Sequence, residues 1–104
     1  MKRLQDNVTI ITGGGKGIGF GLAQAFAEEG SDLVLTGRTE SRLLTAKEEL
    51  ETRYGIRVLP IVADGADEEA IRGVVRKTIE TFGRIDTLVN NAQVSRSGLP
   101  LIDH

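Results

Sequence analysis

Hydrophobic positions fall into two kinds of segment that alternate along the chain. Short runs rich in β-branched residues predict four buried strands, at residues 8–12, 32–36, 56–63 and 85–89. Longer runs, with good helix formers or apolar residues at helical spacing, predict three helices, at residues 20–29, 40–54 and 68–82. The pattern therefore predicts the element order β-α-β-α-β-α-β with short connections.

The second and third predicted helices each carry an apolar stripe that we expect to face a sheet. The stripe of the second helix consists of Leu43, Ala46, Leu50 and Tyr54. The stripe of the third helix consists of Ile71, Val74, Val75, Thr78, Ile79 and Phe82.

Local signals mark the helix ends. Gly30 and Gly55 follow the first two helices, where glycine readily adopts the left-handed conformation of a C-terminal cap. Thr39 and Asp67 precede the second and third helices and are candidate N-caps. These residues predict where each helix begins or ends.

Alternating strands and helices indicate an α/β fold, with a parallel sheet covered by helices on both faces. Right-handed crossovers place the first two helices on one face and the third on the other, with strand order 3-2-1-4. Pro60 cannot donate to a sheet ladder, which suits the edge position of the third strand. We expect the N-terminal half of a Rossmann-like doubly wound parallel sheet, as one half-domain over residues 1–93 with an irregular tail at 94–104.

A glycine-dense turn joins the first strand to the first helix. The segment from Thr12 to Gly19 reads Thr-Gly-Gly-Gly-Lys-Gly-Ile-Gly. Strand, glycine turn and helix together form a phosphate-binding construction, because unpaired N–H groups and the helix dipole favour an anion at a helix N-terminus. Glycine lets a pyrophosphate approach that backbone closely.

The spacing of this turn distinguishes between known phosphate-binding loops. A P-loop needs Ser or Thr after Gly-Lys, and Gly17 follows Lys16. The fingerprint G-x-G-x-x-G finds no register either. The pattern Thr-Gly-x-x-x-Gly-x-Gly resembles the coenzyme loop of the short-chain dehydrogenase/reductase family. Asp64 after the third strand and Asn90-Asn91-Ala92 after the fourth stand in the order and approximate spacing of that family, so the resemblance extends to residue 93.

The resemblance implies that the chain is an NAD(P)-binding half-domain with its coenzyme on the glycine turn. Gly13, Gly17 and Gly19 would form the turn beneath the pyrophosphate, with Gly15 beside them, and Ile18 would offer it a backbone N–H. The alternative is a glycine-rich turn that binds no ligand.

The resemblance also implies roles for residues after the third and fourth strands. Asp64 would accept a hydrogen bond from the adenine amino group, although it could instead cap the next helix. Asn90 would tie the fourth strand to its neighbour, and Asn91 and Ala92 would lie along the ribose and the route to nicotinamide. Gln93 stands where the family usually has glycine, in a position to crowd the nicotinamide ribose.

The end of the second strand bears on the choice of coenzyme. NAD-binding sheets place an acidic residue there to hold the ribose 2′-hydroxyl, and this chain has Gly37 followed by Arg38. A guanidinium pairs with a 2′-phosphate bidentately, and Lys16 adds a second cation, as in NADP-preferring relatives. We therefore expect NADP rather than NAD, the alternative being that both cations are solvated surface charges.

The catalytic residues that the resemblance would imply are missing from the sequence. The family uses a Tyr-x-x-x-Lys pair with a nearby serine, because an ammonium lowers the tyrosine pKa toward working pH. The only tyrosine is Tyr54, four residues before Val58, and Ser95 and Ser97 lie in the tail without a nearby base. We expect a truncated chain that has the coenzyme-binding half of an oxidoreductase and no catalytic residue.

Composition limits the other functions. The net charge of −2, with both signs interspersed, argues against a nucleic-acid surface. The chain has no cysteine, and its one histidine is His104, so a disulfide framework or a zinc centre is not expected. No apolar run is long enough to span a bilayer, and a cytoplasmic protein is expected.

The fourth strand would be an exposed apolar edge in a half-sheet of this kind, and such an edge is a template for pairing with another chain. We expect a homodimer or higher oligomer that buries residues 85–89. Three interpretations remain: part of an NADP-linked oxidoreductase, a non-catalytic nucleotide-binding module, and a structural half-domain.

Overall fold

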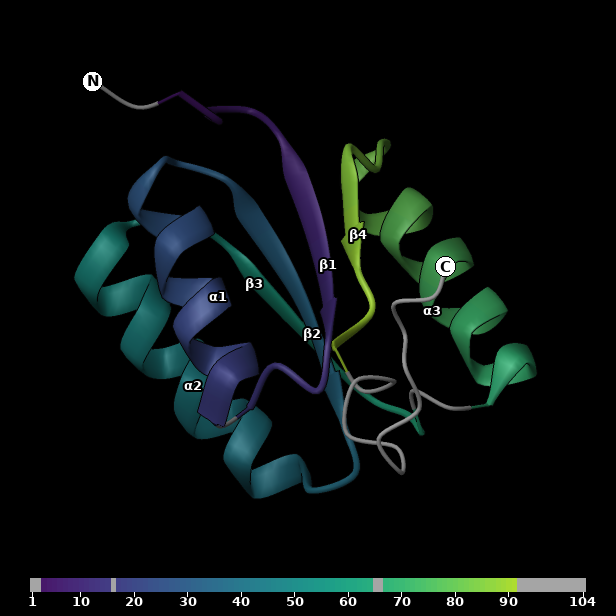
Figure 1. Ribbon diagram of the computed structural model, residues 1–104. Coiled ribbons are helices and arrows are strands. Elements are labelled where there is room, and N and C mark those ends of the chain that lie inside the picture. The colour runs from purple at the N-terminus through teal and green to yellow at the C-terminus, as the bar shows by residue number, and fades with distance from the viewer. Residues whose placement is uncertain (1–2, 16, 65–66, 92–104) are drawn as a thin grey trace, which may run out of the picture.

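The computed structural model describes residues 3–15, 17–64 and 67–91, and strands alternate with helices along them (Figure 1). The elements are β1 (Val8–Thr12), α1 (Gly17–Glu28), β2 (Asp32–Gly37), α2 (Glu40–Tyr54), β3 (Val58–Val62), α3 (Glu68–Phe82) and β4 (Thr87–Val89). The predicted element order is confirmed. The tail at 94–104 and Gln93 lie outside the described residues.

All strand pairs in the sheet are parallel, and the strand order is β3-β2-β1-β4, as predicted. β3 lies at one edge, where Pro60 stands opposite Leu35 of β2. β4 lies at the other edge and pairs with β1 through three residues, from Thr87 to Val89. Both β3 and β4 are shorter than the runs that predicted them, which covered residues 56–63 and 85–89.

Helix α1 begins at Gly17, three residues before the start predicted from helix propensity. Glycine is a poor helix former, so the sequence indicated a start at Phe20. The difference arises from tertiary packing, since the first turn of α1 lies directly against the glycine turn that precedes it.

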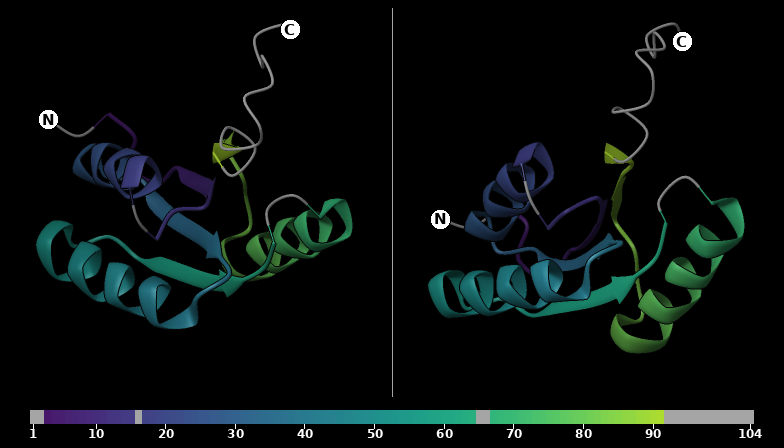
Figure 2. Two further views of the ribbon diagram at one scale, coloured as in Figure 1. Left: turned by 60° about the horizontal axis from the view of Figure 1, so that its bottom comes forward. Right: turned by 90° about the horizontal axis from the view of Figure 1, so that it is seen from below.

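The two faces of the sheet are covered as predicted, with α1 and α2 on one face and α3 on the other (Figures 1 and 2). Side chains of β2 alternate between two cores. Leu33 and Leu35 belong to the core beneath α1 and α2, whereas Val34 belongs to the core beneath α3, together with Val74. Both cores leave the carboxyl edge of the sheet uncovered by these helices.

The predicted stripes face the sheet as buried or half-buried side chains, except for Ile79; Tyr54, Ile71, Val75 and Phe82 are the half-buried members. Leu43, Ala46 and Leu50 are buried beneath α2, and Val74 and Thr78 are buried beneath α3. Ile79, which we predicted to face the sheet, is 46% exposed. Successive helical residues are about 100° apart around the helix axis. Ile79 therefore lies more than a quarter turn away from the buried Thr78, at the margin of the helix face that packs on the sheet.

The helix caps follow the sequence signals, except at one N-terminus. Gly55 and Gly83 adopt left-handed conformations, with φ of 74° and 82°. The Asp67 side chain accepts a hydrogen bond from the Glu69 N–H at 3.0 Å, which confirms it as the N-cap of α3. Thr39 occupies the N-cap position of α2, but its side chain makes no capping hydrogen bond.

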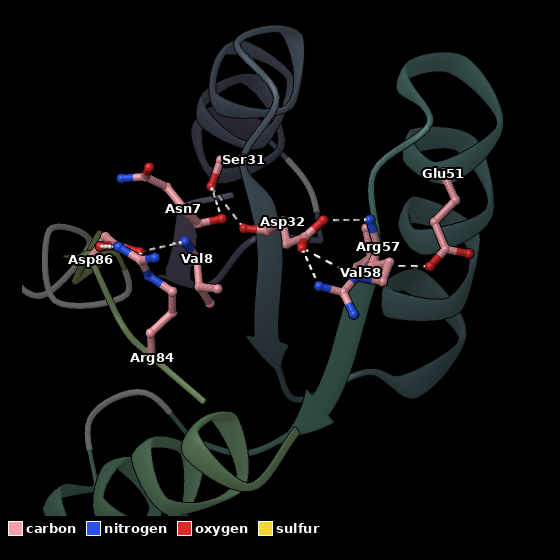
Figure 3. Close-up of polar contacts among 9 residues, drawn as sticks. All are labelled: Asn7, Val8, Ser31, Asp32, Glu51, Arg57, Val58, Arg84 and Asp86. Carbon is pink, nitrogen blue, oxygen red and sulfur yellow. Dashed lines mark hydrogen bonds and ion pairs between the residues drawn. The ribbon is translucent and has the colours of Figure 1, made fainter. Parts of the chain in front are cut away.

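Carboxylates accept backbone N–H groups at the amino edge of the sheet (Figure 3). Asp86 Oδ2 accepts from the Val8 N–H at 2.8 Å, and Glu51 Oε2 accepts from the Val58 N–H at 2.9 Å. Hydrogen bonds from the Arg84 guanidinium and from Val8 hold the pKa of Asp86 below its ordinary value. These contacts lie at the opposite end of the sheet from the glycine turn.

Candidate functional site

The glycine turn is fixed to the carboxyl end of β2. The Gly13 and Gly14 N–H groups both donate to the Thr36 carbonyl oxygen, at 2.8 and 3.1 Å. Gly13 and Gly17 have φ of 70° and 60°, in the left-handed region that side chains disfavour. Glycine is therefore required at these two positions by the course of the backbone.

Gly19 is required for a different reason, which is close packing. A Cβ at Gly19 would overlap the Gly13 carbonyl oxygen and would lie 2.9 Å from Asn91 Nδ2. A Cβ at Gly14 would lie 2.7 Å from the Leu35 side chain. The turn therefore packs against the start of α1 and against β2 only because these residues lack side chains.

Two asparagines at the end of β4 connect that strand to β1 and to the glycine turn. Thr12 Oγ1 donates to Asn90 Oδ1 at 3.0 Å, which confirms that Asn90 ties the fourth strand to its neighbour. Asn91 Nδ2 donates to the Gly13 carbonyl oxygen at 3.4 Å. The end of β4 and the glycine turn are thereby held in one fixed arrangement.

Arg38 and Asp64 are brought together from the ends of β2 and β3. The Ala63 N–H donates to the Gly37 carbonyl oxygen at 2.9 Å, extending the ladder one residue beyond β3. Arg38 Nη2 then lies 3.7 Å from Asp64 Oδ1, with side chains 78% and 49% exposed. The cation and the acid that the sequence assigned to the adenosine half thus form an ion pair across the carboxyl edge.

Ile18 is the most exposed large apolar side chain among the described residues, at 73%, and it lies in the first turn of α1. Gly15 is partly buried, and a Cβ there would contact Leu43 and Arg42 of α2. Lys16 and Ala92 lie outside the described residues. The eight described residues of the predicted site lie on the glycine turn, the first turn of α1 and the ends of β2, β3 and β4.

A hollow of about 370 Å³, which sequence reasoning missed, lies between the glycine turn, α1 and α2. It is lined by Gly15, Gly17, Phe20, Ser41, Arg42, Thr45, Ala46 and Glu49. The lining residues of α2 recur at helical spacing, which could have indicated a common face, but the proximity of that face to the glycine turn depends on how α2 packs.

The described residues provide binding groups and no acid/base pair suited to hydride chemistry. Tyr54 is partly buried against the core beneath α1 and α2, at the end of α2, away from the carboxyl edge. Across the described ranges, no cluster of three or more His, Cys, Asp or Glu side chains could hold a metal. In the same ranges, no helix combines the length and apolar character needed to cross a bilayer.

Comparison with known proteins identifies similar chains. The family model described as short chain dehydrogenase matches residues 7–101. The 12alpha-hydroxysteroid dehydrogenase of a Clostridium species is 57% identical over 100 residues, which cover 90% of this chain and 39% of that protein. The chain therefore spans less than two fifths of the length of this relative.

Solved structures with similar folds carry different coenzymes. L-sorbose reductase from Gluconobacter frateurii, in complex with NADPH and L-sorbose, is 40% identical with a TM-score of 0.82, covering 86% of this chain and 34% of that one. NAD⁺-bound xylitol dehydrogenase is 32% identical with a TM-score of 0.78, covering 84% of this chain and 33% of that one. Each match thus covers most of this chain and about a third of the longer one.

Proposed function

The chain belongs to the short-chain dehydrogenase family, and on that premise we propose that it is an NADP-binding half of an oxidoreductase that interconverts carbonyls and alcohols. The observation that supports coenzyme binding most directly is the close packing of Gly19 on the Gly13 carbonyl oxygen, which leaves no room for a side chain where the glycine turn meets the start of α1. The coenzyme, when bound, supplies the hydride that such a reaction transfers. The chain's own residues bind and orient it.

We propose a division of the site by chemistry. The pyrophosphate lies over the turn formed by Gly13, Gly15, Gly17 and Gly19, where Ile18 offers it a backbone N–H at the start of α1. Asp64 accepts from the adenine amino group, and Asn91 and Ala92 line the way to the nicotinamide. These assignments make the carboxyl edge of the sheet the binding surface.

The preference for NADP rests on Arg38 in this proposal, with Lys16 as a second cation on the same side. Similar solved structures contain NADPH in one case and NAD⁺ in another, so likeness alone leaves both coenzymes open. Gly37 offers no carboxylate to a ribose 2′-hydroxyl, whereas the exposed Arg38 guanidinium can pair with a 2′-phosphate.

The 104 residues contain no Tyr-x-x-x-Lys pair, so we propose that this chain by itself binds coenzyme without catalysing turnover. Calorimetric titration of the chain with NADPH, and with NADH for comparison, tests the proposal. We expect NADPH to bind with micromolar affinity, about −8 kcal/mol, and at least about tenfold more tightly than NADH. Absence of heat and of thermal stabilisation with either coenzyme would contradict a binding function and would favour a purely structural half-domain.

A second proposal is that the chain forms a homo-oligomer through the edge strand β4. Leu88 is 49% exposed, and within the described part of the chain β4 pairs with β1 alone, which leaves its other edge open. We propose that two copies of the 104-residue chain pair through these edges. Sedimentation analysis tests this: a dimer supports it, and a monomer at concentrations around 100 μM contradicts it.

A further inference from the structure

Arg42 lies beside the glycine turn although 27 residues of sequence separate it from Gly15. Helix α2 begins at Glu40, three residues after β2 ends, so Arg42 belongs to its first turn. A Cβ placed on Gly15 would lie 3.5 Å from Arg42 Cβ. The first turn of α2 therefore abuts the glycine turn at the end of β2.

Arg42 and Arg38 differ in whether the guanidinium is paired with an acid. The Arg38 guanidinium forms an ion pair with Asp64, with Nη2 at 3.7 Å from Oδ1. Arg42 is exposed and has no hydrogen bond or ion pair from its side chain within the described ranges 3–15, 17–64 and 67–91. An unpaired guanidinium retains all of its donors for a ligand.

Arg42 also lines the hollow of about 370 Å³, near the end formed by Gly15 and Gly17. Ser41, the preceding residue of α2, lines the hollow as well. The acid in this lining, Glu49, comes seven residues later, which places it roughly 10 Å further along the helix axis. The part of the hollow next to the glycine turn is thus cationic and polar, and the far end is anionic.

We propose that Arg42 is a further residue, in addition to Arg38 and Lys16, that binds the 2′-phosphate of NADP, which would lie in the mouth of this hollow. The inference rests on the proposed coenzyme function. In sheets of this type the adenosine ribose lies beyond the carboxyl end of the second strand, where the first turn of α2 meets the glycine turn. A phosphate carries close to two negative charges, and Arg38 is already partly neutralised by Asp64, so an unpaired guanidinium beside them would add to its binding.

The test compares 2′,5′-ADP with 5′-AMP, two fragments of the coenzyme that differ only by the 2′-phosphate. We expect Arg42→Ala to weaken 2′,5′-ADP binding by about tenfold and to leave 5′-AMP binding within about twofold. Arg42→Lys, which keeps the charge and loses the planar fork, should fall between Arg42→Ala and the unchanged chain. Arg76→Ala is the matched control, because Arg76 is exposed on α3 and its side chain has no ion pair in the described part of the chain.

Each outcome separates this inference from the proposed function. Loss of 2′,5′-ADP affinity in Arg42→Ala, with Arg76→Ala unchanged and both variants melting like the parent chain, supports the inference. Equal affinity of Arg42→Ala and the parent chain for 2′,5′-ADP, or equal losses for both fragments, overturns it and leaves NADP binding standing. If the parent chain binds neither fragment and neither coenzyme, the proposed function and this inference both fail.

Discussion

The carboxylate of Asp86 accepts a hydrogen bond from the backbone N–H of Val8 at 2.8 Å, although 78 residues separate them in the chain (Figure 3). Thr12 and Asn90, also 78 residues apart, make the corresponding connection at the other end of the same strand pair. The short strand β4 is thus held to β1 by side chains at both ends of its three-residue ladder. This arrangement positions Asn91 against the glycine turn.

The Asp86 contact predicts a specific pH dependence of stability. Its pKa in the folded chain is held below the ordinary value of 3.8, first by the Arg84 hydrogen bond and then by the Val8 N–H. A carboxyl with a lowered folded pKa stabilises the fold above its unfolded pKa, and this contribution is lost as pH falls through the folded pKa. Asp86→Asn should therefore lower the melting temperature at pH 7 and flatten its decline below about pH 4.

Melting curves between neutral and acidic pH check this prediction. Glu80→Gln is the control, because Glu80 is exposed on α3 and its side chain has no hydrogen bond or ion pair among the described residues. If the melting temperatures of Asp86→Asn and of the parent chain are equal at pH 7 and decline in the same way with pH, the Asp86 carboxylate does not contribute to the stability of the fold.

Gly19 and Gly21 form a matched pair in α1. A Cβ at Gly19 would overlap the Gly13 carbonyl oxygen, whereas a Cβ at Gly21 would meet no atom within 4 Å. Gly19→Ala should destabilise the chain by about 1–3 kcal/mol or more through overpacking. Gly21→Ala should stabilise it by up to about 1 kcal/mol, since alanine favours helix. Urea denaturation measures both, and similar effects of the two substitutions would refute the close packing of the turn.

The two N-caps should differ in their contribution to stability. Asp67 accepts the Glu69 N–H, while Thr39 makes no side-chain capping bond. We expect Asp67→Ala to cost about 1 kcal/mol and Thr39→Ala to cost less than half of that. Equal losses in urea denaturation would mean that Thr39 caps α2 in solution.

Arg38 should decide between the two coenzymes. Arg38→Ala is expected to weaken NADPH binding by about tenfold and to change NADH binding by less than about twofold, because only NADPH carries the 2′-phosphate. Arg72→Ala is a suitable control, since Arg72 is similarly exposed, at 70%, and similarly paired with an acid, Glu68 at 3.5 Å. Calorimetry that finds equal losses for both coenzymes would assign Arg38 to the adenine ring and remove it from coenzyme choice.

Leu88 tests the proposed assembly through β4. Leu88→Lys should convert a dimer into a monomer, because a charge on an edge strand disfavours pairing with another chain. The substitution should leave the melting temperature of the monomer nearly unchanged, since this side chain is already 49% exposed. Exposed Leu44 of α2, at 48%, provides the control Leu44→Lys. Sedimentation of a dimeric Leu88→Lys chain would place the contact elsewhere.

Most of the fold follows from local features of the sequence. Strand and helix periods, and the glycines that end α2 and α3, act within a few residues of one another, so each element could be located without knowing its neighbours. Strand order followed because right-handed crossovers leave few alternatives. The glycine spacing likewise indicated where the glycine turn lies, since the left-handed backbone at Gly13 and Gly17 is a local requirement.

What the tertiary structure decided depends on residues that are distant in the chain. Helix α1 begins at Gly17 rather than at the predicted Phe20, because its first turn packs on the glycine turn. Ile79 is exposed because the sheet covers only part of the apolar stripe predicted for α3. The ion pair of Arg38 with Asp64 and the approach of Arg42 to Gly15 arise from the packing of separate elements. The sequence therefore determined the elements and the position of the turn. Only packing decided which charges surround that turn, because contacts across the fold have no periodic signature along the chain.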